Sequence, residues 1–411
     1  MGIFGNAEEM NEGFFTIKET QSVSRPGGKV LSCASCGLYK TAVNPRVKPV
    51  GNFKKGLMII YPAPTEHEDR RGVFFDNRVT RLMKNVLFRL GIDIEEDCLS
   101  AYAVGCPIPD DKKPTPAEVG SCQQNILRLI ENRVPRLVLL VGKAPLQAVL
   151  NHRWKGDFGE IEKWRGWTIP DEELGAWLCP VFDPGENFEK QTELIWKQDV
   201  KNAVAKLEEP RERFKKPEIE IIDDLTLLST IKNDMVSIDF ETTGIKPHAP
   251  GHRIACVSVS DSPDHCFSFL LPPTKKEREP LIQLFKNAMI SKCGHNIKYE
   301  ENWSVVRLRC PIQGWLWDSM VAAHLLDNRP GITGLKFQTY VNFGVVDYAS
   351  EITPYLQADH SDGNALNKID RLLTSSEGRM KLLTYNGLDT IYEHRLALMQ
   401  MDLIGYDTLP F

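Results

Sequence analysis

Two hydrophobic patterns alternate along the chain from about residue 30. Short continuous apolar runs are typical of buried strands, whereas apolar residues that recur every three or four positions are typical of amphipathic helices. In the first half, helical patterns occur in VTRLMKNVLFRLG and PAEVGSCQQNILRLIENR. Strand-like runs occupy residues 56–61, 98–104, 136–142 and 177–182. This alternation predicts an α/β sandwich on a parallel sheet.

The alternation resumes after a charged segment. Residues 205–217 carry two prolines, many charges and no apolar periodicity after Leu207, which is typical of a linker. Beyond it we predict helices at 224–233 and 279–289, and a mostly helical last hundred residues that includes 315–327 and 380–401. Strands are predicted at 218–223, 235–244, 253–261 and 292–296. We therefore expect an extension (1–29), a first α/β domain (30–204), the linker, and a second α/β domain (218–411).

Composition narrows the class of protein. The 411 residues are 42% hydrophobic and 26% charged, which is enough for packed cores in two domains. The net charge of −5 excludes a globally basic nucleic-acid binder, although local basic patches suffice for a nuclease. No run approaches the ~20 apolar residues of a membrane span, and the N-terminus lacks a signal-peptide pattern. We expect a cytoplasmic protein without membrane contact, in the host cytoplasm if a phage encodes it.

The segment VSIDFETTG places two acids on one strand face. Val236, Ile238 and Phe240 alternate with polar residues, so Asp239 and Glu241 project to the same side. Neighbouring carboxylates repel each other unless a cation neutralises them. A solvated strand edge remains the alternative interpretation of this pair.

Further acids follow in the second domain. Glu300 and Glu301 come shortly after Asn296, and Tyr385 and Asp389 lie four residues apart, on one helix face. Four converging carboxylates would suit Mg²⁺ or Mn²⁺. Two such ions can activate a water and stabilise the leaving oxygen of an in-line phosphodiester attack, with Tyr385 orienting the water.

The order of these motifs over 218–411 resembles the proofreading exonuclease domain of family A DNA polymerases, within the DEDDy 3′→5′ exonuclease superfamily. The similar segments are DFETTG, GHNIKYE, WDSMVAAHLLD, GLKFQTY and YNGLD. The resemblance implies a ribonuclease H-like (DnaQ-like) fold and two Mg²⁺ or Mn²⁺ ions. It implies that the ions bind Asp239, Glu241, Asp389 and Glu300, where Glu300 replaces the usual Asp. It also implies that Tyr385 orients the attacking water, that Asn296 lies near the substrate end and that Asp318 supports the site.

The same resemblance sets expectations for substrate and partner. A proofreading exonuclease acts on a single-stranded 3′ end or a primer terminus of DNA. The polymerase domain that follows in the family is not in this sequence, so we expect a separate DNA polymerase chain as partner. An RNase D-like exoribonuclease and a non-catalytic scaffold or processivity subunit are the alternatives.

Four of the ten cysteines form a spaced set in the first domain. Cys33 and Cys36 make a CxxC pair, and Cys106 and Cys122 follow later in the chain. In a cytoplasmic protein, spaced cysteines favour metal ligation over disulfides. From the residues alone, a Cys₄ zinc site, an iron–sulfur cluster and a redox-active or incidental CxxC stay open.

The spacing C-x₂-C-x₆₉-C-x₁₅-C and the segment GCPIPDDKKPTPAEVGSC resemble family 4 uracil-DNA glycosylases over about 30–205. The resemblance implies a [4Fe–4S] cluster on these four cysteines, with zinc as the alternative. Some bacteriophage DNA polymerases carry such a domain before the exonuclease.

The catalytic positions of that family are replaced. Pro62 stands where the family has an acid, Tyr102 where it has Asn, and Asp183 where it has the His of His-Pro-Ser. Phe75 remains at the position that the resemblance implies for the base-stacking aromatic. We therefore expect a domain that binds DNA or the polymerase and does not excise uracil, with an active uracil-DNA glycosylase as the alternative.

Overall fold

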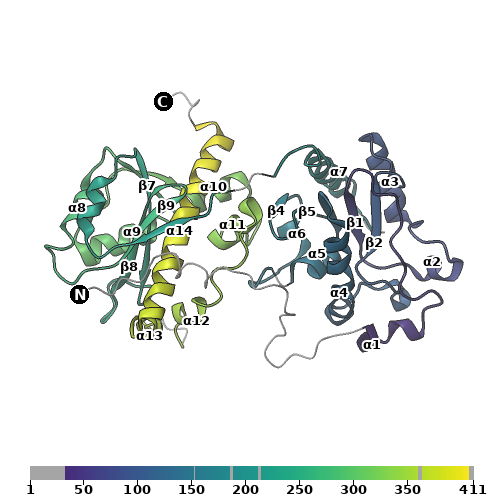
Figure 1. The fold of residues 1–411 in the computed structure, drawn as a ribbon, viewed down its shortest axis with the longest axis horizontal. Coiled ribbons are helices and arrows are strands. Elements are labelled where there is room, and N and C mark those ends of the chain that lie inside the picture. Colours follow the sequence, from purple (N-terminus) through teal and green to yellow (C-terminus); the bar gives the residue numbers. More distant parts are fainter. Residues whose placement is uncertain (1–32, 152, 186–187, 212–213, 360–362, 407–411) are drawn as a thin grey trace, which may run out of the picture.

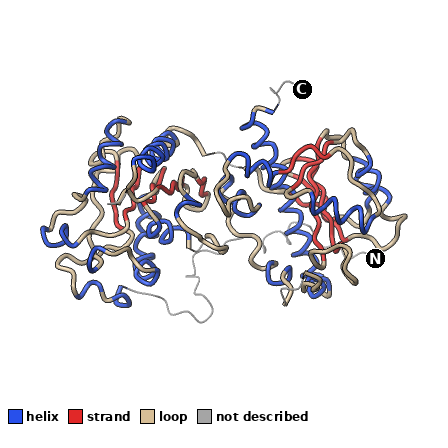
Figure 2. The backbone as a smooth tube through the Cα atoms, turned by 180° about the vertical axis from the view of Figure 1, so that it is seen from behind, coloured by secondary structure: helices blue, strands red, loops and turns tan. Residues whose placement is uncertain are grey.

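The computed structural model describes residues 33–406 except 152, 186–187, 212–213 and 360–362. The expected N-terminal extension, 1–29, lies outside the described residues. Each half of the chain forms a lobe around its own β-sheet, and helix α11 lies between the lobes (Figure 1). Seen from behind, the two sheets stand apart with helices around each (Figure 2).

The N-terminal lobe is built on a five-stranded sheet in the order β2-β1-β3-β5-β4. All pairs are parallel except β4 with β5. Every residue of β1, β2 and β3 is buried, because helices cover both faces of the sheet. The strands are β1 (Leu57–Tyr61), β2 (Cys98–Tyr102), β3 (Leu137–Val141), β4 (Ile169–Asp171) and β5 (Ala176–Val181).

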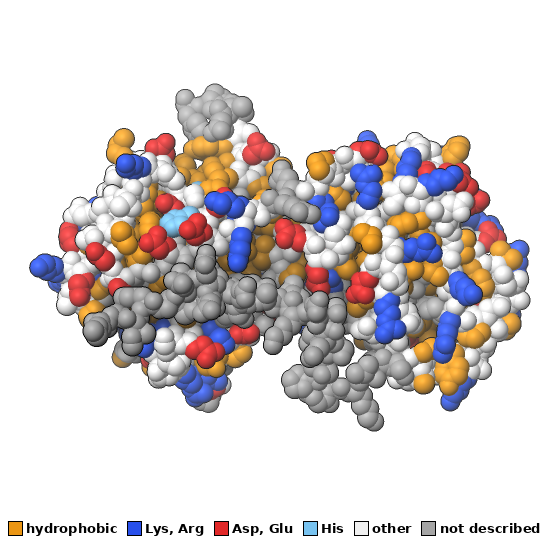
Figure 3. Space-filling view, in the orientation of Figure 1, with side chains coloured by type: hydrophobic (Ala, Val, Ile, Leu, Met, Phe, Trp, Pro, Cys, Tyr) orange, Lys and Arg blue, Asp and Glu red, His pale blue; other side chains and the backbone are white. Residues whose placement is uncertain are grey.

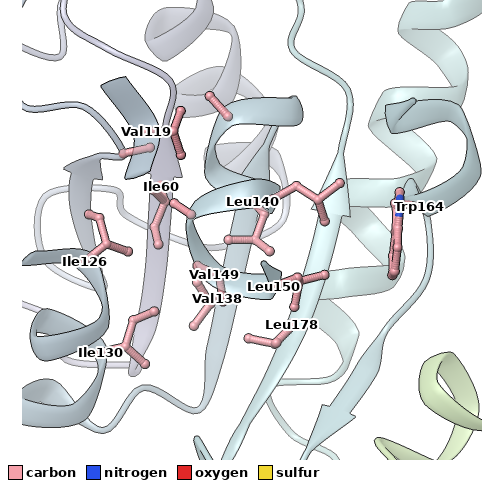
Figure 4. Close-up of a cluster of buried hydrophobic side chains, with 14 of the residues drawn as sticks. Ile60, Val119, Ile126, Ile130, Val138, Leu140, Val149, Leu150, Trp164 and Leu178 are labelled. Carbon is pink, nitrogen blue, oxygen red and sulfur yellow. The ribbon is translucent and has the colours of Figure 1, made fainter. Parts of the chain in front are cut away.

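Two apolar layers flank this sheet. One face packs against α4 and α5, whose aliphatic side chains meet Ile60, Val138 and Leu140 of the strands (Figure 4). The other face packs against α3 and α7, where Trp196 is fully buried. The helices are α1 (Cys33–Cys36), α2 (Glu66–Arg71), α3 (Arg78–Arg89), α4 (Pro116–Arg133), α5 (Lys143–Leu150), α6 (Ile161–Trp164) and α7 (Lys190–Ala205).

The C-terminal lobe has a six-stranded mixed sheet in the order β11-β10-β7-β8-β9-β6. Strands β7, β8 and β9 form an antiparallel meander, and β10 and β11 extend it in parallel. This topology confirms the ribonuclease H-like α/β fold. The strands are β6 (Glu218–Ile221), β7 (Met235–Thr242), β8 (Ile254–Ser262), β9 (His265–Leu270), β10 (Ser291–Gly294) and β11 (Trp315–Asp318).

The longest helix of the described residues, α14, lies close against β7, β8 and β9. Small side chains permit the approach: Ser258 donates to the Asn386 carbonyl (2.9 Å) and Ser268 to the Leu383 carbonyl (2.8 Å). A Cβ on Gly387 would lie 2.7 Å from Ile219. The helices are α8 (Glu279–Lys286), α9 (Lys298–Trp303), α10 (Ser319–Leu326), α11 (Leu335–Phe343), α12 (Thr353–Leu356), α13 (Ile369–Leu373) and α14 (Ser376–Ile404).

Some sequence predictions were wrong in detail. Residues 315–318 form the edge strand β11 rather than the start of a helix, because they pair with β10. Residues 225–230 form a 3₁₀ segment. Strands β4 and β9 were not predicted. In the part of the chain that the structure describes, no helix combines the length and apolar character that a bilayer crossing needs.

The two lobes share one hydrophobic core. Ile332, Phe337, Tyr340 and Val341 belong to the C-terminal half of the chain, yet they are buried in the same cluster as the α4/α5 layer of the N-terminal lobe. The backbone comes equally close, since a Cβ on Gly344 would lie 2.0 Å from the Pro170 carbonyl oxygen. The charged segment after α7 therefore does not separate two independent bodies.

Candidate functional site

A carboxylate cluster forms where β7 faces α14. Oxygen atoms of Asp239, Glu241 and Asp389 all lie within 4.8 Å of one another. The first two come from one face of β7 and the third from α14. A three-carboxylate group of this kind has the hard oxygen donors that Mg²⁺ and Mn²⁺ prefer.

The alternation along β7 produces this arrangement. Val236, Ile238 and Phe240 point into the core beneath the sheet, as predicted. The polar face turns toward α14, where the Asn386 amide donates to Asp239. Asp239 and Glu241 thus lie on one face of β7, as predicted. This strand is an inner one of the sheet, and both side chains are half-buried.

Burial and electrostatic repulsion raise the pKa values of Asp239 and Glu241. Burial, and next the charge of Asp389, raise the pKa of Asp239 to about 7. Burial and the charge of Asp239 also raise the pKa of Glu241 well above its ordinary value. Lys336 opposes both shifts. A cation bound among the carboxylates would remove this repulsion.

Glu300 lies beside this group without joining it. Its oxygens are outside the 4.8 Å group, and its side chain on α9 is 3% exposed. Burial, followed by the charge of Asp239, raises the pKa of Glu300 well above its ordinary value. Its Oε2 atom is buried without a hydrogen-bond partner. Buried polar atoms almost always have a hydrogen-bond partner, and an exception calls for an explanation. The lone pairs of this oxygen are available to a cation.

Two residues that the sequence analysis missed complete the surroundings of Asp389. Lys336 of α11 and the hydroxyl of Tyr348 both donate to Asp389 Oδ1. The Lys336 ammonium also lies 4.3 Å from the ring centre of Tyr385, which is buried one helical turn before Asp389. Lys336 lies in the segment GLKFQTY, which entered the sequence analysis only as part of a resemblance, and no sequence motif pointed to Tyr348.

Asn296 is held in place through its backbone. It has a left-handed φ of 69°, and its N–H donates to Asp318 Oδ1 (3.0 Å) while that of Ile297 donates to Asp318 Oδ2 (3.1 Å). Asp318 also caps α10 through the N–H of Met320 (3.0 Å). Asp318 therefore fixes the turn that leads into α9 and Glu300.

A pocket of about 350 Å³ opens beside the cluster. Its lining includes Glu241, Tyr299, Leu356 and Asn367, and the Tyr299 hydroxyl hydrogen-bonds Thr242 (2.5 Å). The pocket therefore offers a carboxylate together with other polar and apolar side chains.

The four cysteines of the N-terminal lobe come together. Cys33 and Cys36 lie on α1, which contacts α4 and its Cys122, and the electrostatic effect of Cys33 and Cys36 helps to raise the pKa of Cys106. Yet within the described ranges no three of their sulfurs lie within 4.8 Å of one another.

Phe75 lies in a crowded site. The ring of Tyr102 stacks on it at 4.3 Å with an interplanar angle of 8°. The Tyr102 hydroxyl accepts from the Phe75 N–H (3.1 Å) and donates to buried Glu68 (3.2 Å). One face of Phe75 is thus covered from within the protein.

Comparison with known proteins identifies the N-terminal lobe. The model of the uracil DNA glycosylase superfamily matches residues 48–224. A type-4 uracil-DNA glycosylase of Archaeoglobus fulgidus is 30% identical over 145 residues, which make up 33% of this chain and 72% of the relative. The chain belongs to the uracil-DNA glycosylase superfamily.

Other similarities extend beyond the superfamily domain. A DNA polymerase of Bacillus phage SP01 is 21% identical over 319 residues, or 70% of this chain and 34% of the relative. That match is longer than either lobe, so it includes parts of both. Brucella melitensis NrnC has a TM-score of 0.35 at 20% identity and covers 47% of this chain and 82% of its own. A TM-score this low supports no argument about function.

Proposed function

We propose that the C-terminal lobe is a metal-dependent 3′→5′ exonuclease. The observation that carries the proposal is the convergence of Asp239, Glu241 and Asp389. A two-ion site there would supply an activated water and a counter-charge for the leaving oxygen. The three carboxylates would hold one ion, and Asp239 with the unpartnered Glu300 would hold the second.

The remaining residues of the site have supporting roles in this proposal. Tyr385 stands beside Asp389 and would orient the water through its hydroxyl. Asn296, on the turn fixed by Asp318, would contact the terminal nucleotide. The pocket lined by Glu241 and Tyr299 would receive that nucleotide and keep bulk water from it.

DNA is the proposed substrate, with a single-stranded 3′ end or primer terminus as the point of attack. The support is the glycosylase-superfamily domain in the same chain and the similarity to a phage DNA polymerase across both lobes. A separate DNA polymerase is the proposed partner, with a role in phage-type replication and a place in the host cytoplasm. Co-purification from native cells followed by mass spectrometry tests the partner.

The test of the exonuclease is digestion of a 5′-labelled single-stranded oligonucleotide with Mg²⁺. Asp239→Ala with Glu241→Ala should abolish shortening from the 3′ end while DNA binding persists. The matched control is Glu218→Ala with Glu220→Ala, two exposed acids at the same spacing on β6 of the same sheet. Unchanged digestion by the first double variant would sink the assignment. Preference for the equivalent RNA oligonucleotide would favour an RNase D-like enzyme, and no digestion at all a scaffold.

For the N-terminal lobe we infer DNA or polymerase binding without uracil excision. Pro62, Tyr102 and Asp183 occupy the family's catalytic positions, and Tyr102 covers Phe75. In the face seen in Figure 3, Lys and Arg side chains are scattered over this lobe among acidic ones rather than gathered in one patch. The test is alkali cleavage of a uracil-containing duplex after incubation with the Asp239/Glu241 variant. Strand breaks at uracil would show an active glycosylase.

The four cysteines are proposed to hold a [4Fe–4S] cluster, which would stabilise the N-terminal lobe by linking the segments that carry them. Protein purified without oxygen should be brown, with broad absorbance near ~400 nm from sulfur-to-iron charge transfer. Colourless protein with one zinc per chain would decide for the alternative. Cys106→Ser should destabilise the lobe, since cluster binding contributes to folding.

A further inference from the structure

Helix α11 serves both lobes at once. Its nine residues are LKFQTYVNF, and six of them are buried. Successive helical residues point about 100° apart, so neighbours on such a helix reach different surroundings. Lys336 and Phe337 are such neighbours: the first reaches the carboxylate cluster and the second enters the core of the N-terminal lobe.

Three tryptophans of the N-terminal lobe surround Phe337. The ring centroids of Trp154, Trp164 and Trp167 lie 5.7, 5.1 and 6.0 Å from that of Phe337. The Lys163 ammonium lies 4.8 Å from the same ring. Edge-to-face aromatic packing of this kind depends on geometry, so it fixes the rotation of α11 about its axis.

A second contact fixes the approach of the chain to α11. Arg329 donates to the carbonyls of Glu162 and Arg165, each at 2.7 Å, and its guanidinium stacks on Trp167 at 5.6 Å. Asp327 pairs with the same guanidinium (2.8 Å). The segment leading into α11 is therefore anchored to the N-terminal lobe through backbone atoms as well as rings.

On its other side, α11 presents Lys336, whose ammonium contacts Asp389 of the carboxylate cluster. The Lys336 Nζ donates to Asp389 and to the Tyr348 hydroxyl (3.0 Å). It lies 4.2 and 4.3 Å from the ring centres of Tyr348 and Tyr385. Cation–π attraction to these rings would hold the ammonium near the site when Asp389 binds a metal ion instead of Lys336.

We propose that the glycosylase-superfamily domain positions Lys336 through α11, so that Lys336 competes with the metal for Asp389 and, once displaced, binds the substrate phosphate. This inference rests on the proposed exonuclease function and extends it. Lys336 would contact substrate, whereas Trp154 and Phe337 are positioning residues. The glycosylase-superfamily domain then becomes part of the nuclease rather than an accessory beside it.

The test measures Mn²⁺ affinity and oligonucleotide digestion on the full chain. Lys336→Met should tighten Mn²⁺ binding about tenfold, because a competing like charge is removed. The same variant should slow digestion about thirtyfold, since a charged contact to phosphate is lost. Lys336→Arg should restore both values toward those of the parent. This pairing of tighter metal with slower digestion is not the signature of a loosened fold, which weakens both.

The decisive variant lies in the other lobe. Trp154→Ala should shift both values in the same directions as Lys336→Met, by roughly threefold, because α11 loses part of its aromatic contact. The matched control is Trp177→Ala, a half-buried tryptophan of the same domain that packs on the opposite face of the sheet. Unfolding by urea reports any general loss of stability in either variant.

The outcomes separate this inference from the proposed function. If the parent digests DNA and Trp154→Ala behaves as Trp177→Ala does, the coupling is wrong and the exonuclease stands. Weaker Mn²⁺ binding by Trp154→Ala also overturns the coupling. If the parent does not digest DNA, yet the Mn²⁺ shifts occur, the coupling stands and the proposed function fails.

Discussion

Buried carboxylates occur in both lobes, and their surroundings differ. Glu68 of the N-terminal lobe is 1% exposed, and it accepts hydrogen bonds from the Thr65 N–H and hydroxyl, the Asp76 N–H, the Asn77 amide and the Tyr102 hydroxyl. Glu300 of the C-terminal lobe is 3% exposed and retains an oxygen with no partner. A carboxylate satisfied by the protein is structural, whereas one left unsatisfied among other acids either keeps a proton or binds a cation.

The neighbours of these carboxylates show the same contrast. Tyr102 gives Glu68 a hydrogen bond and Phe75 a stacked partner, so this region of the N-terminal lobe is well packed. In the carboxylate cluster, repulsion persists and the pKa values of Asp239 and Glu241 stay raised.

The largest expected effect is on the digestion rate when Asp389 of the carboxylate cluster is replaced. Asp389→Asn removes one charge from the cluster and should lower the digestion rate about a thousandfold, or about 4 kcal/mol, because metal binding supplies several kcal/mol to the transition state. Initial rates on a labelled oligonucleotide measure it. Glu131→Ala, an exposed acid on α4, is the control. A variant within threefold of the parent would contradict the role of Asp389.

The next effect concerns Glu68. Glu68→Ala removes the acceptor of five donors, four of them half-buried, and should reduce the free energy of unfolding by about 3 kcal/mol. Urea titration measures it, with digestion per folded molecule unchanged. Retained stability together with lost digestion would reverse the roles assigned to the two lobes.

Added Mg²⁺ should stabilise the protein through the carboxylate cluster of the C-terminal lobe only. At a Mg²⁺ concentration one hundred times its dissociation constant, the folded parent should gain about 2.7 kcal/mol. Thermal melts with and without Mg²⁺ should differ for the parent and coincide for Asp389→Asn. An equal rise in both proteins would place the stabilising ion elsewhere.

The smallest effect is a pH dependence without metal. The folded-state pKa of Asp239, about 7, exceeds its ordinary value of 3.8, so the folded protein binds the extra proton. This contribution to stability is complete below about pH 4 and is lost as the pH rises through 7. Asp239→Asn should flatten the curve by about 2.6 kcal/mol, as measured by urea titration from pH 5 to 8. A parent curve that rises over this range in the same way as the variant would show that Asp239 is not shifted.

The sequence predicted the parts of the site that local pattern controls. The alternation around Asp239 and Glu241 and the four-residue spacing of Tyr385 and Asp389 follow from strand and helix periods alone. The contacts of Lys336 and Tyr348 could not be predicted, because they depend on how α11 and the following segment pack. Likewise, β11 was predicted as helix, since an apolar edge strand of four residues has no period of its own and gains its conformation from β10.

The shared core has a consequence for synthesis on the ribosome. Trp154 and Trp164 emerge early, but the residues that complete their packing, Phe337 and Tyr340, are made about 170 residues later. At about 5–20 residues per second, the aromatic surface of the nascent N-terminal lobe stays uncovered for roughly ten to thirty seconds. During that interval the chain exposes an aggregation-prone aromatic patch that a chaperone could bind. In a chain truncated before α11, the patch would stay exposed.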